Sequence, residues 1–311
     1  MNSTESYNNV TQMSTSNNRT SEIILVVFFV LTMISICFFL YFICIVLIVY
    51  FTAPHVRENS RYVLFAHMLI NDTMYLSLGL FLALAHQLFF IPVPLCYFIL
   101  SITTATFRVT PYNLAVMSLE RYLAICYPLQ YPMLCTVQRS YSVISVMWIV
   151  GLLPNVADVI VLSISVKKDF YSQRLLCKQE KFLVQPVQTT IRSVTFLGSL
   201  IMVALVILIT YIKVMMVARK TGSGQSSATK AGRTVMLHAF QLLLCVVSLT
   251  SIITESYGGM YMVLFNFLVF MCLPRLLSPL IYGIRDEVFR KCIRNIYSTI
   301  YTKMCSPKLK A

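Results

Sequence analysis

Three side chains that can act together follow one another as Glu120-Arg121-Tyr122, at the end of a long apolar stretch. An arginine where hydrocarbon meets water is costly to desolvate unless a partner holds it. Glu120 is an adjacent partner, and a switch that releases Arg121 would expose its guanidinium to another protein. The stretch is therefore either a signalling hinge or an interfacial anchor, depending on how many helices surround it.

Two further ionisable residues, which carry opposite charges, interrupt other apolar segments and could pair with each other. Asp72 lies within an apolar run, where an acid needs either a partner or a hydrated ion. Arg275 stands one helical turn before Ser278-Pro279 in another apolar run and is a candidate for that partner. The two alternatives at Asp72 are a bound cation and an internal salt bridge.

Arg108 is the most unusual charge in the chain because of its depth. It precedes Arg121 by thirteen residues, which is about 20 Å along a helix at about 1.5 Å per residue and places it near mid-membrane. Thr104, Phe107 and Pro111 flank it, and Pro111 leaves the carbonyl of Phe107 without its helical donor.

The apolar segments contain other charged residues that could lie near Arg108. Arg192 adds a cation, and Asp158 and Glu255 add acids. One interpretation is an anion-binding pocket, in which Arg108 or Arg192 clamps a carboxylate or a sulfate. The other is an internal ion pair, such as Arg108 with Asp158 or Arg192 with Glu255, and both interpretations remain open.

The sequence contains no constellation that is typical of an enzyme. It has no nucleophile–base pair, no metal-ligand set and no phosphate-binding glycine loop. Its ten cysteines include no C-x-x-C pair, and His67, His86 and His238 lie on separate segments. We expect no catalysis, no cofactor and no metal.

The chain is rich in hydrophobic residues and poor in charged ones. Hydrophobic residues make up 58% of the 311 residues and charged residues only 12%, whereas soluble domains average about 25% charged. The chain is therefore a polytopic membrane protein. Its net charge of +14 reflects topology and contact with anionic membrane lipids rather than nucleic acid.

Seven apolar segments are long enough to span a bilayer, which takes about 20 residues each. They cover residues 23–50, 62–86, 95–126, 141–164, 187–217, 229–255 and 261–284. Residues 285–302 place apolar side chains on one helical face among basic ones, the pattern of a helix lying on a membrane. The predicted fold is an all-α membrane protein: a seven-transmembrane helix bundle with a short amphipathic cytoplasmic helix.

The charges between segments predict the orientation. The links after the first, third and fifth segments and the tail are basic, so they and the carboxyl terminus are predicted to be cytoplasmic; the basic link after the fourth segment is an exception. The polar tail 1–22 carries glycosylation triplets at Asn2, Asn9 and Asn18. We predict a glycosylated extracellular tail (1–22), a receptor domain (23–284) and a cytoplasmic helix and tail (285–311) in the plasma membrane.

With this topology the chain resembles the rhodopsin-like G-protein-coupled receptors. The stretch 117–131, MSLERYLAICYPLQY, resembles the odorant-receptor signature, and 278–285, SPLIYGIR, resembles the matching motif of the seventh helix. Residues 65–73, FAHMLINDT, are most like fish-type odorant receptors. The chain departs from the class in lacking the Trp-x-Pro hinge of the sixth helix and in carrying Ser278 where most receptors have asparagine.

The resemblance implies roles for several residues. It implies a disulfide between Cys96 and Cys177 that holds the loop after the fourth helix over the bundle. It implies a G-protein switch at Glu120, Arg121, Tyr122, Tyr211, His238, Pro279 and Tyr282. The ligand-binding candidates, chosen from the charges and side chains around Arg108 rather than from the resemblance, are Thr104, Phe107, Arg108, Arg192 and Glu255. In the class the position of Asp72 binds sodium, which a salt bridge with Arg275 would displace.

The function that the resemblance implies is that of an odorant receptor. A small-molecule odorant, with an acidic one as a candidate, would bind within the bundle and activate a heterotrimeric G protein of the olfactory, stimulatory type, raising cAMP. One alternative is a non-olfactory chemosensory receptor for a metabolite. A second is a transporter or channel, in which Asp72, Arg108 and Arg275 would mark an ion path.

Overall fold

The structure, a computed structural model, describes residues 57–220 without a gap, most of residues 23–52, and single residues at 236, 240, 243, 272, 275 and 294. Within this part, five helices are long and apolar enough to cross a membrane. The first of them is Met33–Thr52. A multi-span helical protein is what the composition predicted.

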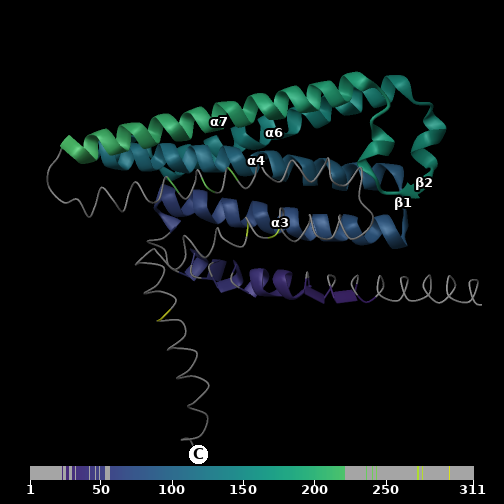
Figure 1. The fold of residues 1–311 in the computed structure, drawn as a ribbon, viewed down its shortest axis with the longest axis horizontal. Helices are drawn as coiled ribbons and strands as arrows, with labels where there is room; N and C mark the ends of the chain where they lie inside the picture. Colours follow the sequence, from purple (N-terminus) through teal and green to yellow (C-terminus); the bar gives the residue numbers. More distant parts are fainter. Residues whose placement is uncertain are drawn as a thin grey trace, which may run out of the picture.

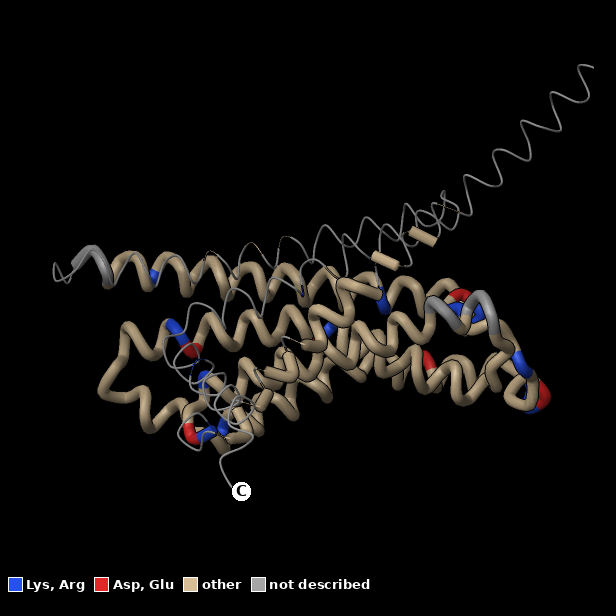
Figure 2. Tube along the Cα trace, turned by 90° about the horizontal axis from the view of Figure 1, so that it is seen from below, with Lys and Arg blue, Asp and Glu red and all other residues tan. Residues whose placement is uncertain are grey.

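The other four spans are the long helices α3 (Ser60–Leu88), α4 (Val93–Cys126), α6 (Val137–Ser165) and α7 (Pro186–Lys220). They run alongside one another (Figure 1). Charged residues gather at the two ends of the helices, with few between them (Figure 2). This distribution fits a bundle whose middle lies in hydrocarbon.

The helices begin earlier than the apolar runs predict, because polar caps precede them. The Asn59 side chain accepts from the Arg61 N–H (3.1 Å) and starts α3, and the Thr136 hydroxyl accepts from the Arg139 N–H (3.3 Å) and starts α6. Arg139 precedes the predicted segment 141–164, but it lies in the first turn of α6. Capping side chains satisfy N–H groups that have no partner within the helix.

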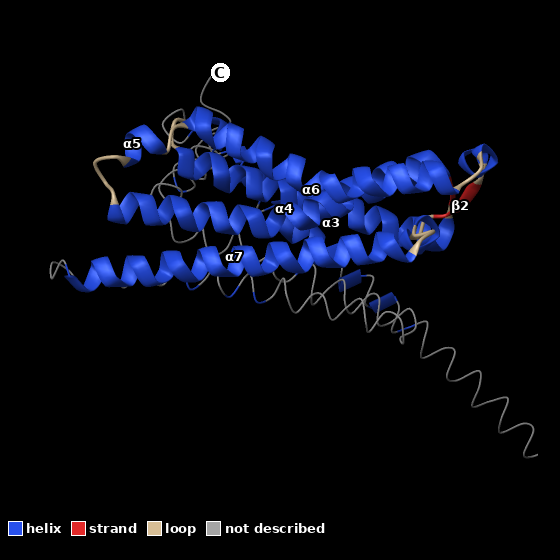
Figure 3. Cartoon of the chain, turned by 90° about the horizontal axis from the view of Figure 1, so that it is seen from above, coloured by secondary structure: helices blue, strands red, loops and turns tan. Residues whose placement is uncertain are grey.

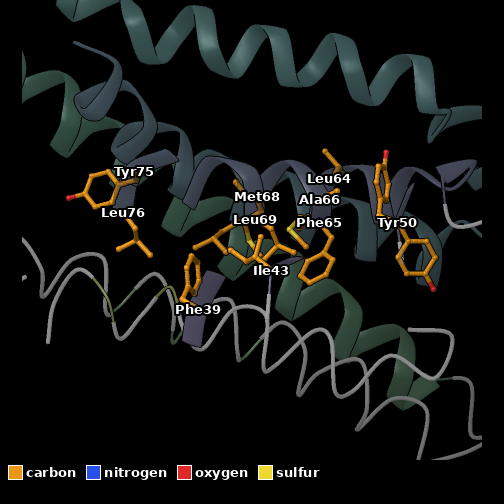
Figure 4. Close-up of a cluster of buried hydrophobic side chains, with 14 of the residues drawn as sticks. Phe39, Ile43, Tyr50, Leu64, Phe65, Ala66, Met68, Leu69, Tyr75 and Leu76 are labelled. Carbon is orange, nitrogen blue, oxygen red and sulfur yellow. The ribbon is translucent and has the colours of Figure 1, made fainter. Parts of the chain in front are cut away.

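Apolar side chains hold the first helix against α3. Phe39 and Ile43 face Met68 and Leu69 in the close-up (Figure 4), and all four are almost completely buried. The same cluster continues to Leu114 on α4 and to residues of α7. Because lipid is as apolar as these side chains, close packing rather than exclusion of water favours this contact.

The two ends of the bundle carry different connections. At one end, strand β1 (Phe90–Pro92) pairs antiparallel with β2 (Arg174–Leu176). Along the chain, β2 lies between the short helices η1 (Lys168–Ser172) and η2 (Gln179–Phe182). At the opposite end lies the four-residue helix α5, Tyr131–Leu134 (Figure 3). The β1–β2 pair is a small departure from the predicted all-α fold.

Candidate functional site

Glu120 is held by two partners at the end of α4 near α5. Its Oε1 accepts a hydrogen bond from the Tyr131 hydroxyl at 2.6 Å, and its Oε2 lies 3.8 Å from the Arg121 Nε. Glu120 is buried, whereas the Arg121 side chain is 20% exposed. The predicted Glu120–Arg121 pair is therefore present, with Tyr131 as a further partner.

The chain folds back to place Tyr131 beside Glu120. Pro128 cannot continue α4, and Pro132 is compatible with the first turn of α5, where no N–H donor is needed. Burial and the negative charge of Glu120 both raise the pKa of Tyr131. Its hydroxyl therefore keeps its proton at neutral pH and remains the donor.

The remaining described members of the predicted switch are less tightly held. The Tyr122 hydroxyl lies 3.5 Å from that of Tyr127, whose ring meets it edge to face. Tyr211 on α7 is half-buried against the main apolar cluster. His238, Pro279 and Tyr282 lie outside the described residues.

Asp72 is completely buried on α3 and has a cationic neighbour. Its Oδ1 lies 3.3 Å from the Arg275 Nε and accepts from the Thr110 hydroxyl at 3.4 Å. The Arg275 guanidinium also lies 3.7 Å from the centre of the Tyr75 ring, a distance at which cation–π attraction is effective. Of the two alternatives at Asp72, the structure contains the salt bridge.

Asp158 pairs with Arg192, which corrects the Arg108–Asp158 pair named from the sequence. The Arg192 Nε donates to the Asp158 Oδ2, and both side chains are largely buried. Asp158 therefore does not bind Arg108. Arg108 itself is 8% exposed, and its Nη1 has no hydrogen-bond partner within the described part of the chain. Glu255 lies outside the described residues.

The other two ligand candidates have occupied polar groups or packed rings. The Thr104 hydroxyl donates to the Asn155 side-chain oxygen at 3.1 Å, beside the Ser101 carbonyl. The Phe107 ring stacks between those of Tyr75 and Phe196, with centroids 5.7 Å and 5.3 Å away. Phe107 therefore joins α3, α4 and α7 through aromatic contact.

A polar cluster that the sequence did not predict joins three helices. The Trp148 indole N–H donates to the His67 Nε2 at 2.9 Å, and the His67 Nδ1 lies 3.1 Å from the Asn113 Oδ1. Because an indole can only donate, the His67 Nε2 must be unprotonated, and the neutral ring carries its proton on Nδ1. No spacing signal links residues on three separate segments.

A disulfide closes the β1–β2 end of the bundle. Cys96 in the first turns of α4 is bonded to Cys177, which directly follows β2, as the resemblance implied. The η2 residue Phe182 is buried against the Tyr97 ring, at 5.3 Å between centroids. The disulfide thus fixes the loop after α6 over the end of the bundle.

The described residues contain no group of three histidine, cysteine, aspartate or glutamate side chains that could hold a metal ion. What they do contain is a helical bundle with a disulfide-linked loop at one end, paired charges in its middle and an acid–arginine pair at the other end. The profile of the family described as 7 transmembrane receptor (rhodopsin family) matches residues 44–282. The chain belongs to this family. As a member of a receptor family, it is not an enzyme.

Relatives of this receptor agree with the predicted odorant-receptor resemblance. Odorant receptor 131-2 of Danio rerio is 26% identical over 252 residues, which are 76% of each chain. Olfactory receptor 6S1 of Homo sapiens is 23% identical over 203 residues, covering 60% of this chain and 59% of that one. Olfactory receptor 56A1 of Homo sapiens is 21% identical over 218 residues, or 66% of this chain and 68% of that one. Similarity to olfactory-type receptors of the rhodopsin family, including one from a fish, is confirmed.

Proposed function

We propose that this receptor is an odorant receptor that binds a small molecule within the helix bundle and activates a heterotrimeric G protein of the olfactory, stimulatory type, raising cAMP. The observation that carries the proposal is the Glu120–Arg121 pair at the end of α4, with Tyr131 holding the acid. In a receptor of this family, release of Arg121 at that end would offer it to the G protein. The names of the similar receptors support the odorant class.

The proposed topology has seven spans, with the glycosylated tail 1–22 outside and the amphipathic helix 285–302 inside. The positive-inside rule supports this orientation, since the links predicted to be cytoplasmic are basic. It makes the β1–β2 end of the bundle extracellular and the α5 end cytoplasmic. A disulfide at the extracellular end agrees with an oxidising compartment.

A cAMP reporter assay tests the function. Cells that display the epitope-tagged receptor would be exposed to panels of acidic, amine and neutral odorants, with surface staining to normalise expression. We expect at least one panel to raise cAMP, and the Arg121→Ala variant to lose that response at equal surface level. Ligand-gated current without any cAMP response would instead favour the channel alternative.

A further inference from the structure

Arg108 is a buried cation whose charge is not compensated by the residues described around it. Its side chain lies in the middle of α4, 8% exposed, and its Nη1 has no hydrogen-bond partner there. An arginine guanidinium keeps its charge under all ordinary conditions. An unpaired charge at this depth is strongly destabilising, which is why such charges normally have partners.

The nearest acid has a different partner. Asp158 and Arg192 both lie close enough to Arg108 for their charges to act on it. However, the Asp158 carboxylate accepts from the Arg192 Nε, and Asp158 is only 2% exposed. Two arginines therefore share one carboxylate between α4, α6 and α7. Among the described residues the local charge is left positive, and Arg108 is the member without a hydrogen bond to the acid.

We propose that Arg108 binds the oxyanion group of an acidic small molecule inside the bundle. This rests on the proposed function, since it assigns a chemical class to the ligand of that receptor. Carboxylates and sulfonates suit a guanidinium because two N–H groups can donate to two oxygens at once. A neutral ligand would leave the buried charge uncompensated.

Neighbouring groups favour Arg108 as the donor. The Thr104 hydroxyl, one turn away on the same helix face, already donates to Asn155 and is not available to an anion. Phe107 stacks with Phe196 beside this position, so an apolar tail would meet aromatic rings. The expected ligand therefore has one anionic head and an apolar body.

The exposed loop after α6 supports an anionic ligand independently. Between residues 167 and 181 it exposes five cations against two acids. The cations are Lys167, Lys168, Arg174, Lys178 and Lys181, and the acids are Asp169 and Glu180. Since β2 and the Cys96–Cys177 disulfide fix this loop over one end of the bundle, its field would raise the local concentration of anions there.

Thermal unfolding of the purified full-length receptor tests the proposal without a G protein. The probes are butanoate, hexanoate, octanoate and hexane-1-sulfonate, each compared with the amide or alcohol of equal chain length. We expect at least one anion, but not its neutral match, to raise the unfolding temperature in a saturable way. The Arg108→Met variant should need roughly 10- to 100-fold more of that anion for half the effect, the range for a lost hydrogen bond to a charged group.

Two further variants separate local from general charge effects. Arg192→Met releases Asp158 to pair with Arg108, and so should also weaken the response to the anion. Lys213→Met removes an exposed cation of α7 near the α5 end and should leave the response unchanged. If Arg108→Met does not fold, Arg108→Lys replaces it and should show a smaller loss, because a lysine cannot donate in the bidentate manner.

Several results would overturn the proposal. They are equal stabilisation by neutral matches, an undiminished response in Arg108→Met, and no response to any anion. A response to anions that appears only in the Glu255→Gln variant would also overturn it, because Glu255 would then already neutralise Arg108 in the native receptor. Anion binding without any cAMP response would instead count against the proposed function alone, and cAMP responses to neutral odorants only would count against this inference alone.

Discussion

Replacing Tyr131 by phenylalanine should raise the activity of the receptor in the absence of ligand. The substitution keeps the ring in α5 and removes only the hydroxyl that donates to the Glu120 Oε1 at 2.6 Å. That bond holds the acid which in turn lies 3.8 Å from the Arg121 Nε. If the active state releases Arg121 from Glu120, loss of the bond weakens the resting state selectively.

The size of the effect follows from the bond and its surroundings. A hydrogen bond to a charged group contributes roughly 1.5–3 kcal/mol, and because Tyr131 is only half-buried we take a value just below this range, about 1–1.4 kcal/mol. A difference of about 1.4 kcal/mol is a factor of ten in an equilibrium. Basal activity should therefore rise about five- to tenfold.

Basal cAMP per receptor at the cell surface measures this effect, and Tyr127→Phe is the matched control. Tyr127 is exposed and meets Tyr122 at 3.5 Å, a length at which little hydrogen-bond energy is lost. Because this contact is weak, we expect the basal cAMP of this control to change by less than about twofold. Equal basal activity in the two variants would refute the role assigned to Tyr131.

The Tyr131 effect should not depend on pH near neutrality. Because the pKa of Tyr131 is raised in the folded protein, the stabilisation is complete below the ordinary tyrosine pKa of about 10 and is lost only as the pH rises through the higher value.

The remaining predictions concern buried pairs. Asp158→Asn removes the acid that pairs with the largely buried Arg192 and should lower the free energy of unfolding by about 3–5 kcal/mol, measured by thermal or denaturant unfolding. Exchange of sodium for choline should leave the unfolding temperature unchanged, because Arg275 occupies the Asp72 carboxylate, whereas Arg275→Met should make it sodium-dependent. Cys177→Ala should reduce stability by roughly 2–4 kcal/mol and reduce the receptor at the cell surface, measured by staining.

The sequence predicted those features of the fold that depend on one segment at a time. Apolar length is a property of a single segment, and it located the spans that became α3, α4, α6 and α7. It missed their first turns, because caps such as Asn59 and Thr136 are polar. It also missed α5, since a helix of four residues has no periodicity to detect.

Contacts between segments were harder to predict, and the ion pairs show why. Either of two arginines could meet Asp158, and the choice depends on how α4, α6 and α7 are rotated about their axes. Spacing within one helix does not determine that rotation. The same limit applies to the His67–Trp148 hydrogen bond and to the Tyr131–Glu120 bond. The Asp72–Arg275 pair was foreseen as an alternative because an acid at that depth needs some cation.

The polar contacts suggest which helix a ligand at Arg108 would move. α3, α4 and α6 are joined by hydrogen bonds at mid-membrane, through Asn71 to the Thr106 carbonyl and through His67 to Asn113 and Trp148. α7 is held to α6 by Arg192, whose partner is Asp158. An anion beside Arg108 would also attract Arg192 and compete with Asp158 for it. The binding energy of an acidic ligand would therefore act on the attachment of α7, while α4, which carries Arg121 at its far end, stays fixed to α3 and α6.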